Sequence, residues 1–236
     1  MSARGHQGLL LAGGSGSANV SSLLHFDGTS GSTTFTDETG KVWTAQSGAV
    51  LSTSVKQFGT ASGDFTAAGQ ALITTPNSTD FDFGAGDFTL ECFVYIIGAP
   101  KGSNHTIFSN LTDTPAQGVR TIINNARVPQ IVNAYGLSGH THSILPAMAI
   151  PLNTWTHVAW TRQGSVLRTF VGGALDGQDT TVSGAITNSV YSMQIGSLKF
   201  VSNWGLNGYI EEARITKGVA RYASTFTPPT APFSYP

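Results

Sequence analysis

Short apolar runs separated by turn residues dominate the chain from Ser21 onward. The runs are rich in β-branched and aromatic residues and are bounded by Gly, Pro, Asn, Asp or Ser, which is typical of β-strands. No segment shows a sustained 3.6-residue apolar stripe, so helices are not expected. The pattern therefore predicts an all-β sandwich or barrel. The predicted strands are SSLLHF, KVWTA, QALITT, DFTLECFVYII, HTIFSN, VRTIIN, THSIL, TWTHVAWTR, VLRTFVG, YSMQIG and NGYIEEARI.

The first twenty residues, MSARGHQGLLLAGGSGSANV, follow a different pattern. This glycine-rich and serine-rich segment has no alternation and too few apolar residues for a core of its own. We predict a flexible anchoring arm over residues 1–20 and a single domain over residues 21–236. Leu9, Leu10 and Leu11 are the residues that a partner protein would hold. The alternative is that the arm folds back onto its own domain.

Composition narrows the classes of partner. Twelve Lys and Arg against thirteen Asp and Glu give a net charge of -1, so there is no basic field for nucleic acid or anionic membranes. No apolar stretch reaches the length of a membrane span, and LLLA is too short for a signal peptide, so neither membrane insertion nor export is expected. The lone Cys92 cannot form an internal disulfide. We expect it to be a buried apolar residue in a protein that folds in a reducing cytosol.

Several motifs occur in the order found in one family. They are SSLLHFDGTSGSTTFTDETG, SVKQFGTASGDFTAAGQALIT, FDFGAGDFTLECFV, NTWTHVAWTRQGSVLRTFVGGAL and NGYIEEARITKGVARYASTFTPPTAPF. Together they resemble a concanavalin A-like, laminin G-type jelly roll, in the version carried by virion proteins of tailed bacteriophages. The resemblance covers Ser21 to Phe233. It implies a sandwich of two antiparallel sheets in which the last strand lies beside the first, and a tail after Thr216 that lies across the domain as a clasp.

The two acids in YIEEARI raise the question of a metal. Simple alternation places Glu212 on the wetter face and Glu211 on a face shared with apolar residues, where a carboxylate needs a cation or hydrogen-bond donors. The resemblance implies a structural calcium held by Asp27 and by Glu211, although many relatives have Asp at the second position. The alternative, which we favour, is an Arg or backbone partner for Glu211. No cofactor is expected to be required. The predicted faces are Tyr209, Glu211, Ala213 and Ile215 on one side and Ile210, Glu212 and Arg214 on the other.

Glycoside hydrolases with this fold use paired carboxylates on an E-x-D-x-x-E strand. The glutamates here are Glu38, Glu91, Glu211 and Glu212, and none of them begins that spacing. We therefore predict that the protein is not an enzyme, with Glu91 as the carboxylate to test.

Candidate sugar-binding residues lie mainly in the irregular stretch 97–151. GHTH places His140 and His142 on one side of an extended segment, and these two could chelate a metal with His105, although a polar hairpin is the favoured interpretation. Tyr135 and Trp204 could stack on sugar rings, but Trp and Tyr also fill β-sandwich cores. The candidate carbohydrate-binding set is Tyr135, His140, His142 and Trp204.

Two functions follow from these observations. The first is a virion structural protein, a capsid decoration or tail-fibre component, that folds in the host cytoplasm and is displayed on the virion surface. Its arm would bind other virion proteins, and a homo-oligomer is a further option. The second is a carbohydrate-binding adhesin or receptor-binding protein that recognises a host-surface glycan. A glycoside hydrolase ranks third.

Overall fold

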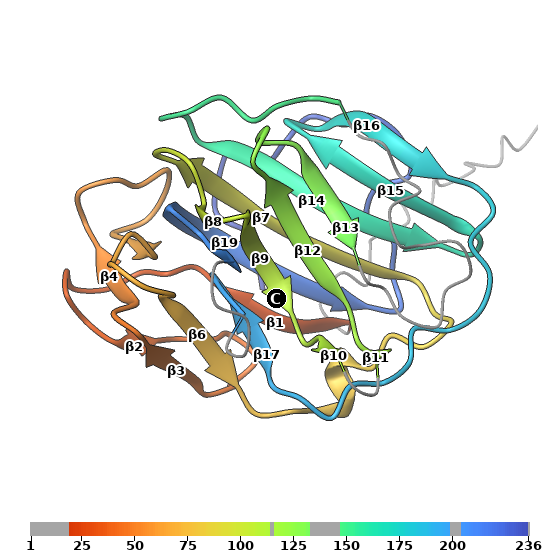
Figure 1. The fold of residues 1–236 in the computed structure, drawn as a ribbon, viewed down its shortest axis with the longest axis horizontal. Coiled ribbons are helices and arrows are strands. Elements are labelled where there is room, and N and C mark those ends of the chain that lie inside the picture. Colours follow the sequence, from red (N-terminus) through yellow and green to blue (C-terminus); the bar gives the residue numbers. More distant parts are fainter. Residues whose placement is uncertain (1–18, 114–115, 133–146, 199–203, 236) are drawn as a thin grey trace, which may run out of the picture.

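The computed structural model describes residues 19–113, 116–132, 147–198 and 204–235. Two antiparallel β-sheets pack face to face, and Figure 1 shows the seven-stranded sheet in front of the eight-stranded one. The eight-stranded sheet has the order β16-β15-β14-β7-β19-β5-β4, with β1 also paired to β19. Its strands are β16 (Ala174–Asp179), β15 (Val166–Val171), β14 (Thr156–Gln163), β7 (Phe88–Ile96), β19 (Gly208–Lys217), β5 (Ser62–Asp64), β4 (Val50–Ser52) and β1 (Val20–Leu24).

The seven-stranded sheet has the order β13-β12-β9-β17-β6-β3-β2. Its strands are β13 (Pro129–Val132), β12 (Arg120–Asn124), β9 (Asn104–Ser109), β17 (Met193–Ile195), β6 (Leu72–Thr75), β3 (Trp43–Gln46) and β2 (Thr34–Phe35). The remaining elements are the pairs β10 (Thr112–Asp113) with β11 (Ala116–Gln117) and β8 (Lys101–Gly102) with β18 (Trp204–Gly205), and the 3-10 turn η1 (Thr79–Phe81). The predicted strand THSIL lies outside the described residues. In the described part of the chain, no helix is long and apolar enough to cross a membrane.

The predicted two-sheet sandwich is confirmed, and so is the pairing of its ends. β1 runs antiparallel to β19, with Leu24 opposite Ala213. Segments from the two ends of the described chain therefore lie next to each other in one sheet (Figure 1).

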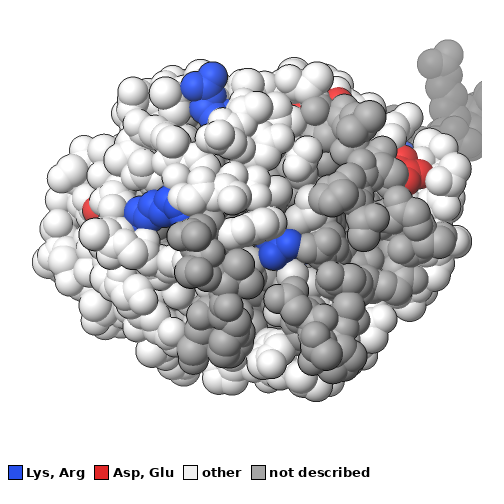
Figure 2. Space-filling model, viewed as in Figure 1, with Lys and Arg blue, Asp and Glu red and all other residues white. Residues whose placement is uncertain are grey.

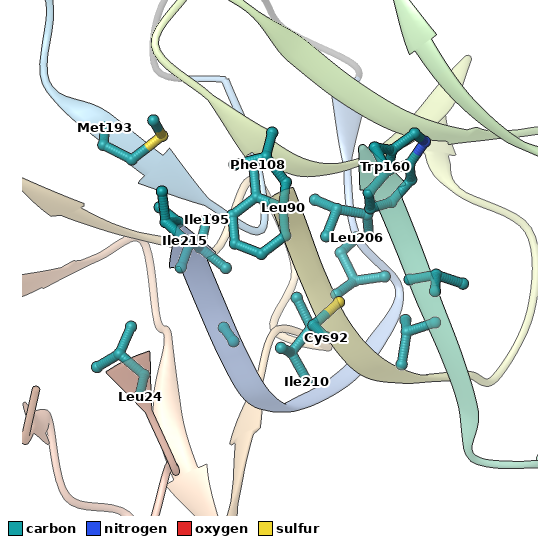
Figure 3. Close-up of a cluster of buried hydrophobic side chains, with 14 of the residues drawn as sticks. Leu24, Leu90, Cys92, Phe108, Trp160, Met193, Ile195, Leu206, Ile210 and Ile215 are labelled. Atoms are coloured by element: carbon teal, nitrogen blue, oxygen red, sulfur yellow. The ribbon is translucent and has the colours of Figure 1, made fainter. Parts of the chain in front are cut away.

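The core lies between the sheets and draws alternate residues from each strand. Leu90 and Cys92 of β7 point into it with Trp160 of β14, and Phe108 and Ile195 come from the facing sheet (Figure 3). Cys92 is fully buried, as predicted for a small apolar residue. Burial raises the pKa of its thiol, which keeps it protonated and unreactive.

The predicted faces of β19 are wrong because this strand contains a β-bulge. Glu212 has a φ of 54°, and the pairing with β7 shifts between Glu211 and Arg214. A bulge adds one residue to one strand, so the alternation of faces changes phase beyond it. Ala213 and Ile215 therefore join Ile210 in the core, whereas Glu211 lies on the other face of the sheet.

Glu212 is also not on a wet face. It is only 1% exposed. Its carboxylate lies 2.8 Å from His25 Nδ1 and accepts the backbone N–H of Phe233 at 2.7 Å. The hydrogen bond that His25 donates to Glu212 raises the pKa of His25, which favours the charged imidazolium. Glu212 is thus a tether between β19, the residue after β1 and the C-terminal tail.

The tail after β19 crosses the outer face of the eight-stranded sheet, as the resemblance implied. We call residues 219–235 the C-terminal clasp. Thr89 Oγ1 of β7 donates to Val219 O at 3.0 Å, and Thr161 Oγ1 of β14 donates to Tyr222 O at 3.0 Å. The rings of Tyr222 and Phe226 stack at 3.6 Å. These contacts fix the clasp to two neighbouring strands.

Glu91 of β7 is the central anchor beneath the clasp. One carboxylate oxygen accepts Nε and Nη2 of Arg214, each at 2.8 Å, and the other accepts the Tyr222 hydroxyl at 2.7 Å and lies 3.1 Å from His157 Nε2. Burial alone would raise the pKa of Glu91, but the His157 hydrogen bond and the Arg214 charge outweigh it and lower the pKa to about 2. This carboxylate therefore ties β7, β14, β19 and the clasp together.

Replacing Glu91 with Gln tests this anchor. We expect a loss of about 3–5 kcal/mol in the free energy of unfolding at pH 7, because a buried cation loses its partner. Since the folded pKa of Glu91 lies below the ordinary 4.5, its contribution is present above pH 4.5 and is lost as the pH falls towards about 2. Urea unfolding at pH 7, 4.5 and 3 measures both effects.

The matched control is Glu38→Gln, which alters a glutamate whose side chain is 39% exposed. It should leave both the stability and its acid dependence close to those of the parent protein. If Glu91→Gln retains the parent's full loss of stability in acid, Glu91 is not the group responsible.

Candidate functional site

Most of the predicted sugar-binding residues cannot be placed. Tyr135, His140 and His142 lie outside the described residues, as do Leu9, Leu10 and Leu11 of the arm. Their roles stay predictions. The arm was predicted to end at residue 20, and the structure begins β1 at Val20.

Trp204 is the one member of that set that the structure describes. It is half-buried in β18, and the guanidinium of Arg120 lies over its ring at 4.0 Å from the centroid. A cation–π contact of this kind occupies one face of the indole. That face serves packing between β12 and β18 and is closed to a sugar ring.

His105, the third histidine considered as a metal ligand, is fully buried in β9. Its Nδ1 accepts the backbone N–H of Asn207 at 3.2 Å. Burial, helped by the nearby Lys101 charge, lowers the pKa of His105 to about 4. The imidazole is therefore neutral at physiological pH and supports the loop before β19.

Asp27 and Glu211, the candidate calcium ligands, both hold the loop before β5. Glu211 Oε1 accepts the backbone N–H of Gln57 at 2.6 Å, and Oε2 accepts that of Phe58 at 2.8 Å. Asp27 Oδ1 accepts the backbone N–H and the hydroxyl of Thr60. We call residues 57–60 the carboxylate-held loop. Glu211 thus has the backbone partner that the favoured alternative proposed.

This arrangement does not fit a calcium ion. Ca²⁺ takes six to eight oxygen ligands, whereas both Glu211 oxygens already accept N–H groups. Among the described residues, no group of three or more His, Cys, Asp or Glu could hold a metal ion. Burial raises the pKa of Glu211 to about 7, against the effect of its two backbone donors, and the charges of Glu212 and Asp27 raise it further.

A set of partly exposed aromatic side chains, which the sequence pattern did not predict, lies on the outer face of the eight-stranded sheet. Tyr209 of β19 is directly opposite Tyr95 of β7, with ring centroids 6.0 Å apart. Trp155, just before β14, lies 5.5 Å from Tyr95 on its other side. All three are half-buried. We call Trp155, Tyr95 and Tyr209 the aromatic row.

A polar residue, Asp64, lies next to the row on the neighbouring strand. Asp64 of β5 pairs directly with Tyr209. Its carboxylate accepts the backbone N–H of Thr66 at 2.7 Å and is only partly buried. Burial raises the pKa of Tyr209, and the Asp64 charge adds to this, so the phenol stays protonated and able to donate. Flat rings therefore stand beside a carboxylate acceptor and a hydroxyl donor.

The aromatic row is rigid because its neighbours are packed. Trp155 packs against a small apolar cluster centred on Phe93. The centroid of the Phe93 ring lies 5.1 Å from that of Phe58 in the carboxylate-held loop and 6.1 Å from that of Phe233 in the clasp. The clasp and the loop thus cover the adjacent part of the sheet. The three rings of the row stay partly open beside them.

The opposite face of the molecule has a different character. Figure 2 shows the side of the seven-stranded sheet, where the described Lys and Arg side chains are scattered and do not form a patch. Of the described surfaces, the aromatic row is the better candidate for recognition.

The carboxylate-held loop yields a direct test for a metal. Glu211→Ala leaves the backbone N–H groups of Gln57 and Phe58 without their carboxylate acceptor. It should cost about 1–3 kcal/mol in the free energy of unfolding, since each hydrogen bond contributes about 0.5–1.5 kcal/mol. EDTA should leave the melting temperature of the parent protein unchanged. Thermal unfolding by circular dichroism, with Glu38→Ala as the control, measures both. A drop in EDTA that added Ca²⁺ reverses would contradict this assignment.

Comparison with known proteins places the chain in a family. The family model of the concanavalin A-like lectin/glucanases superfamily matches residues 67–221. A search of curated proteins finds no matching sequence.

Three solved structures show the likeness of the fold. The binding domain of Paraclostridial mosquitocidal protein 1 has 13% identity and a TM-score of 0.56, over 86% of this chain and 50% of that one. Domain 4 of an extracellular arabinanase from Geobacillus stearothermophilus, in complex with arabinotriose, has 16% identity and a TM-score of 0.55, over 85% and 93%. Trypanosoma rangeli sialidase in complex with sialic acid has 16% identity and a TM-score of 0.59, over 86% and 31%.

This chain therefore spans about half of the toxin domain and about a third of the sialidase. At these identities the solved structures show the fold alone. The family model covers more than half of the chain, and its match agrees with the two antiparallel sheets and their shared core. The chain belongs to the concanavalin A-like lectin/glucanases superfamily.

Proposed function

We propose that this chain is a non-enzymatic, glycan-binding jelly-roll domain displayed on the surface of a bacteriophage virion. The observation that carries the glycan-binding part is the aromatic row, with Asp64 beside it, on the partly open half of the eight-stranded sheet.

The chemistry of the row suits a sugar chain. A pyranose or furanose ring presents C–H groups on its faces and hydroxyls at its edge. Tyr and Trp offer large, rigid, amphipathic surfaces that lose little conformational entropy on binding. Asp64 can accept sugar hydroxyls next to the rings, and the Tyr209 hydroxyl can donate. A row across several strands matches an extended chain of sugar units better than a single sugar.

The glutamates support a binding role without catalysis. A glycosidase needs one carboxylic acid and one carboxylate that both reach the glycosidic bond. Glu91 is fully enclosed by Arg214, His157 and Tyr222. Glu211 and Glu212 are buried and already accept N–H groups. The three are structural anchors.

The likeness to known domains points in the same direction. The arabinanase domain, of which this chain covers 93%, was solved in complex with arabinotriose. At least one other domain of similar fold has thus been solved with a sugar oligomer.

The virion assignment rests on the bacteriophage-type motifs of the chain, above all W-x-H-V-A-x-T-R and ITKGVARY. On this proposal the arm binds capsid or tail subunits through Leu9, Leu10 and Leu11, and the jelly roll faces the host. The domain folds in the host cytoplasm before assembly. Capsid decoration and tail fibre are both compatible with such an arm.

Affinity electrophoresis tests glycan binding. Gels containing β-glucan, arabinan or surface polysaccharide from candidate host bacteria should retard the full chain in at least one case. Trp155→Ala and Tyr95→Ala should each weaken the affinity measured by that retardation about fivefold or more, because central aromatic contacts typically contribute more than about 1 kcal/mol. Tyr191→Ala, at an exposed aromatic outside the row, is the matched control.

If no polysaccharide retards the protein, glycan binding is wrong. If hydrolysis products appear and vanish in Glu91→Gln, the protein is an enzyme.

Removal of the arm tests the virion role. Deleting residues 1–18 keeps β1 complete, because Val20 is its first residue. The shortened protein should melt at nearly the same temperature but should no longer co-sediment with particles. Retained co-sedimentation would refute anchoring by the arm, and unfolding of the shortened protein would favour an arm that folds back.

A further inference from the structure

A polar groove lies at the opposite end of β19 from the aromatic row. It has a volume of about 500 Å³ and is lined by residues that include Ser21, Thr39, Lys41, Asp80 and Lys217. A smaller hollow of about 350 Å³ adjoins it and shares Lys41 and Asp80. We call the larger hollow the lysine groove. We propose that the lysine groove binds a carboxylated sugar, such as a uronic acid residue.

The groove is separate from the aromatic row. Tyr209 is the second residue of β19, whose last residue is Lys217. A strand rises about 3.3 Å per residue, so these residues are roughly 26 Å apart along it. The inference adds a second site to the proposed glycan-binding function and depends on different residues.

Both lysines are held in place before any ligand arrives. Lys41 Nζ lies 2.7 Å from Asp80 Oδ2 and 5.6 Å from the centre of the Phe81 ring. Lys217 Nζ donates to Thr79 O at 2.6 Å. An ammonium group has three N–H donors, so each of these contacts leaves others for a ligand. Side chains that are already ordered lose less entropy on binding.

The charge balance of the groove favours an anion. Two ammonium groups, Lys41 and Lys217, oppose one carboxylate, Asp80, which leaves one net positive charge in a chain whose net charge is -1. The hydrogen bond from Lys41 lowers the pKa of Asp80, and the Lys217 charge contributes to the same direction. Asp80 is therefore ionised at physiological pH.

The charge of Asp80 determines which anions can bind in the lysine groove. Its side chain is 52% exposed, so a simple anion that approaches the lysines is repelled by a neighbouring negative charge. A sugar acid offsets this repulsion because the ring that carries the carboxylate for the lysines also carries hydroxyl groups that can donate to Asp80. The hydroxyls of Ser21 and Thr39 donate to Asp80 O and Asp37 Oδ1, so their oxygens can accept further sugar hydroxyls.

Nuclear magnetic resonance of the full, 15N-labelled chain tests the proposal with D-glucuronate as the probe. Glucuronate should shift the amide signals of Ser21, Asp80, Lys217 and Gly218 in a saturable way, with weaker binding at higher salt. D-Glucose should cause no shifts there. Inorganic phosphate should bind at least tenfold more weakly than glucuronate.

Three variants sharpen the test. Lys217→Gln should weaken glucuronate binding at least fivefold, whereas Lys56→Gln, at an exposed lysine outside the groove, should leave it unchanged. Asp80→Asn should reduce the preference for glucuronate over phosphate, because it removes both the repulsion and the hydroxyl acceptor.

Each remaining outcome counts against the proposal. Equal binding of phosphate and glucuronate would show a general anion site and would overturn the sugar assignment. Shifts confined to the aromatic row would overturn the groove and leave glycan binding intact. No shift with any probe would also overturn the groove, while retention on polysaccharide gels decides the proposed function separately.

Discussion

The hydrogen bonds of the buried Glu91 carboxylate are the interactions on which the packing of the clasp against the eight-stranded sheet depends. A charge without solvent needs several strong partners, and Glu91 finds them in Arg214, His157 and Tyr222. These partners come from β14, from β19 and from the clasp that follows β19, all far in the sequence from Glu91 in β7. Satisfying one carboxylate therefore requires the correct alignment of three strands and the docking of the tail. The aromatic row is positioned by the same alignment, because Tyr95 and Glu91 lie on one strand and Trp155 lies just before another.

The sequence predicted those features whose signal is local or belongs to a known motif. The apolar run FTLECFVYI correctly indicated a strand with Cys92 as a buried residue. The closing motif correctly implied that the last strand pairs with the first and that the tail returns across the sheet. Backbone donors for Glu211 were likewise the favoured alternative.

The features that the sequence did not predict share a physical cause: each depends on contacts between residues that are distant in the sequence. Alternation assumes a regular strand, so it misplaced Glu212, whose left-handed conformation is stabilised by contacts with His25 and Phe233. The aromatic row requires Asp64, Tyr209 and Tyr95 to share one register across three strands. Outward alternation of Tyr95 in β7 was the one local signal for it. The lysine groove combines residues near positions 20, 40, 80 and 217, and no short motif joins them.

At the bulge, the backbone preference of residue 212 conflicts with the contacts that its side chain makes. A non-glycine residue at a φ of 54° costs about 1 kcal/mol or more in backbone strain, and glycine would relieve it. Glycine, however, could not reach His25 or the N–H of Phe233. The strand itself would become easier to form while the end of the clasp lost its tether. The substitution would therefore lower the stability of the whole domain as well as free its end, because each hydrogen bond to a charged group contributes about 1.5–3 kcal/mol, more than the strain that glycine relieves. The residue at this position thus serves the attachment of the chain end, and the intrinsic preference of the backbone is secondary.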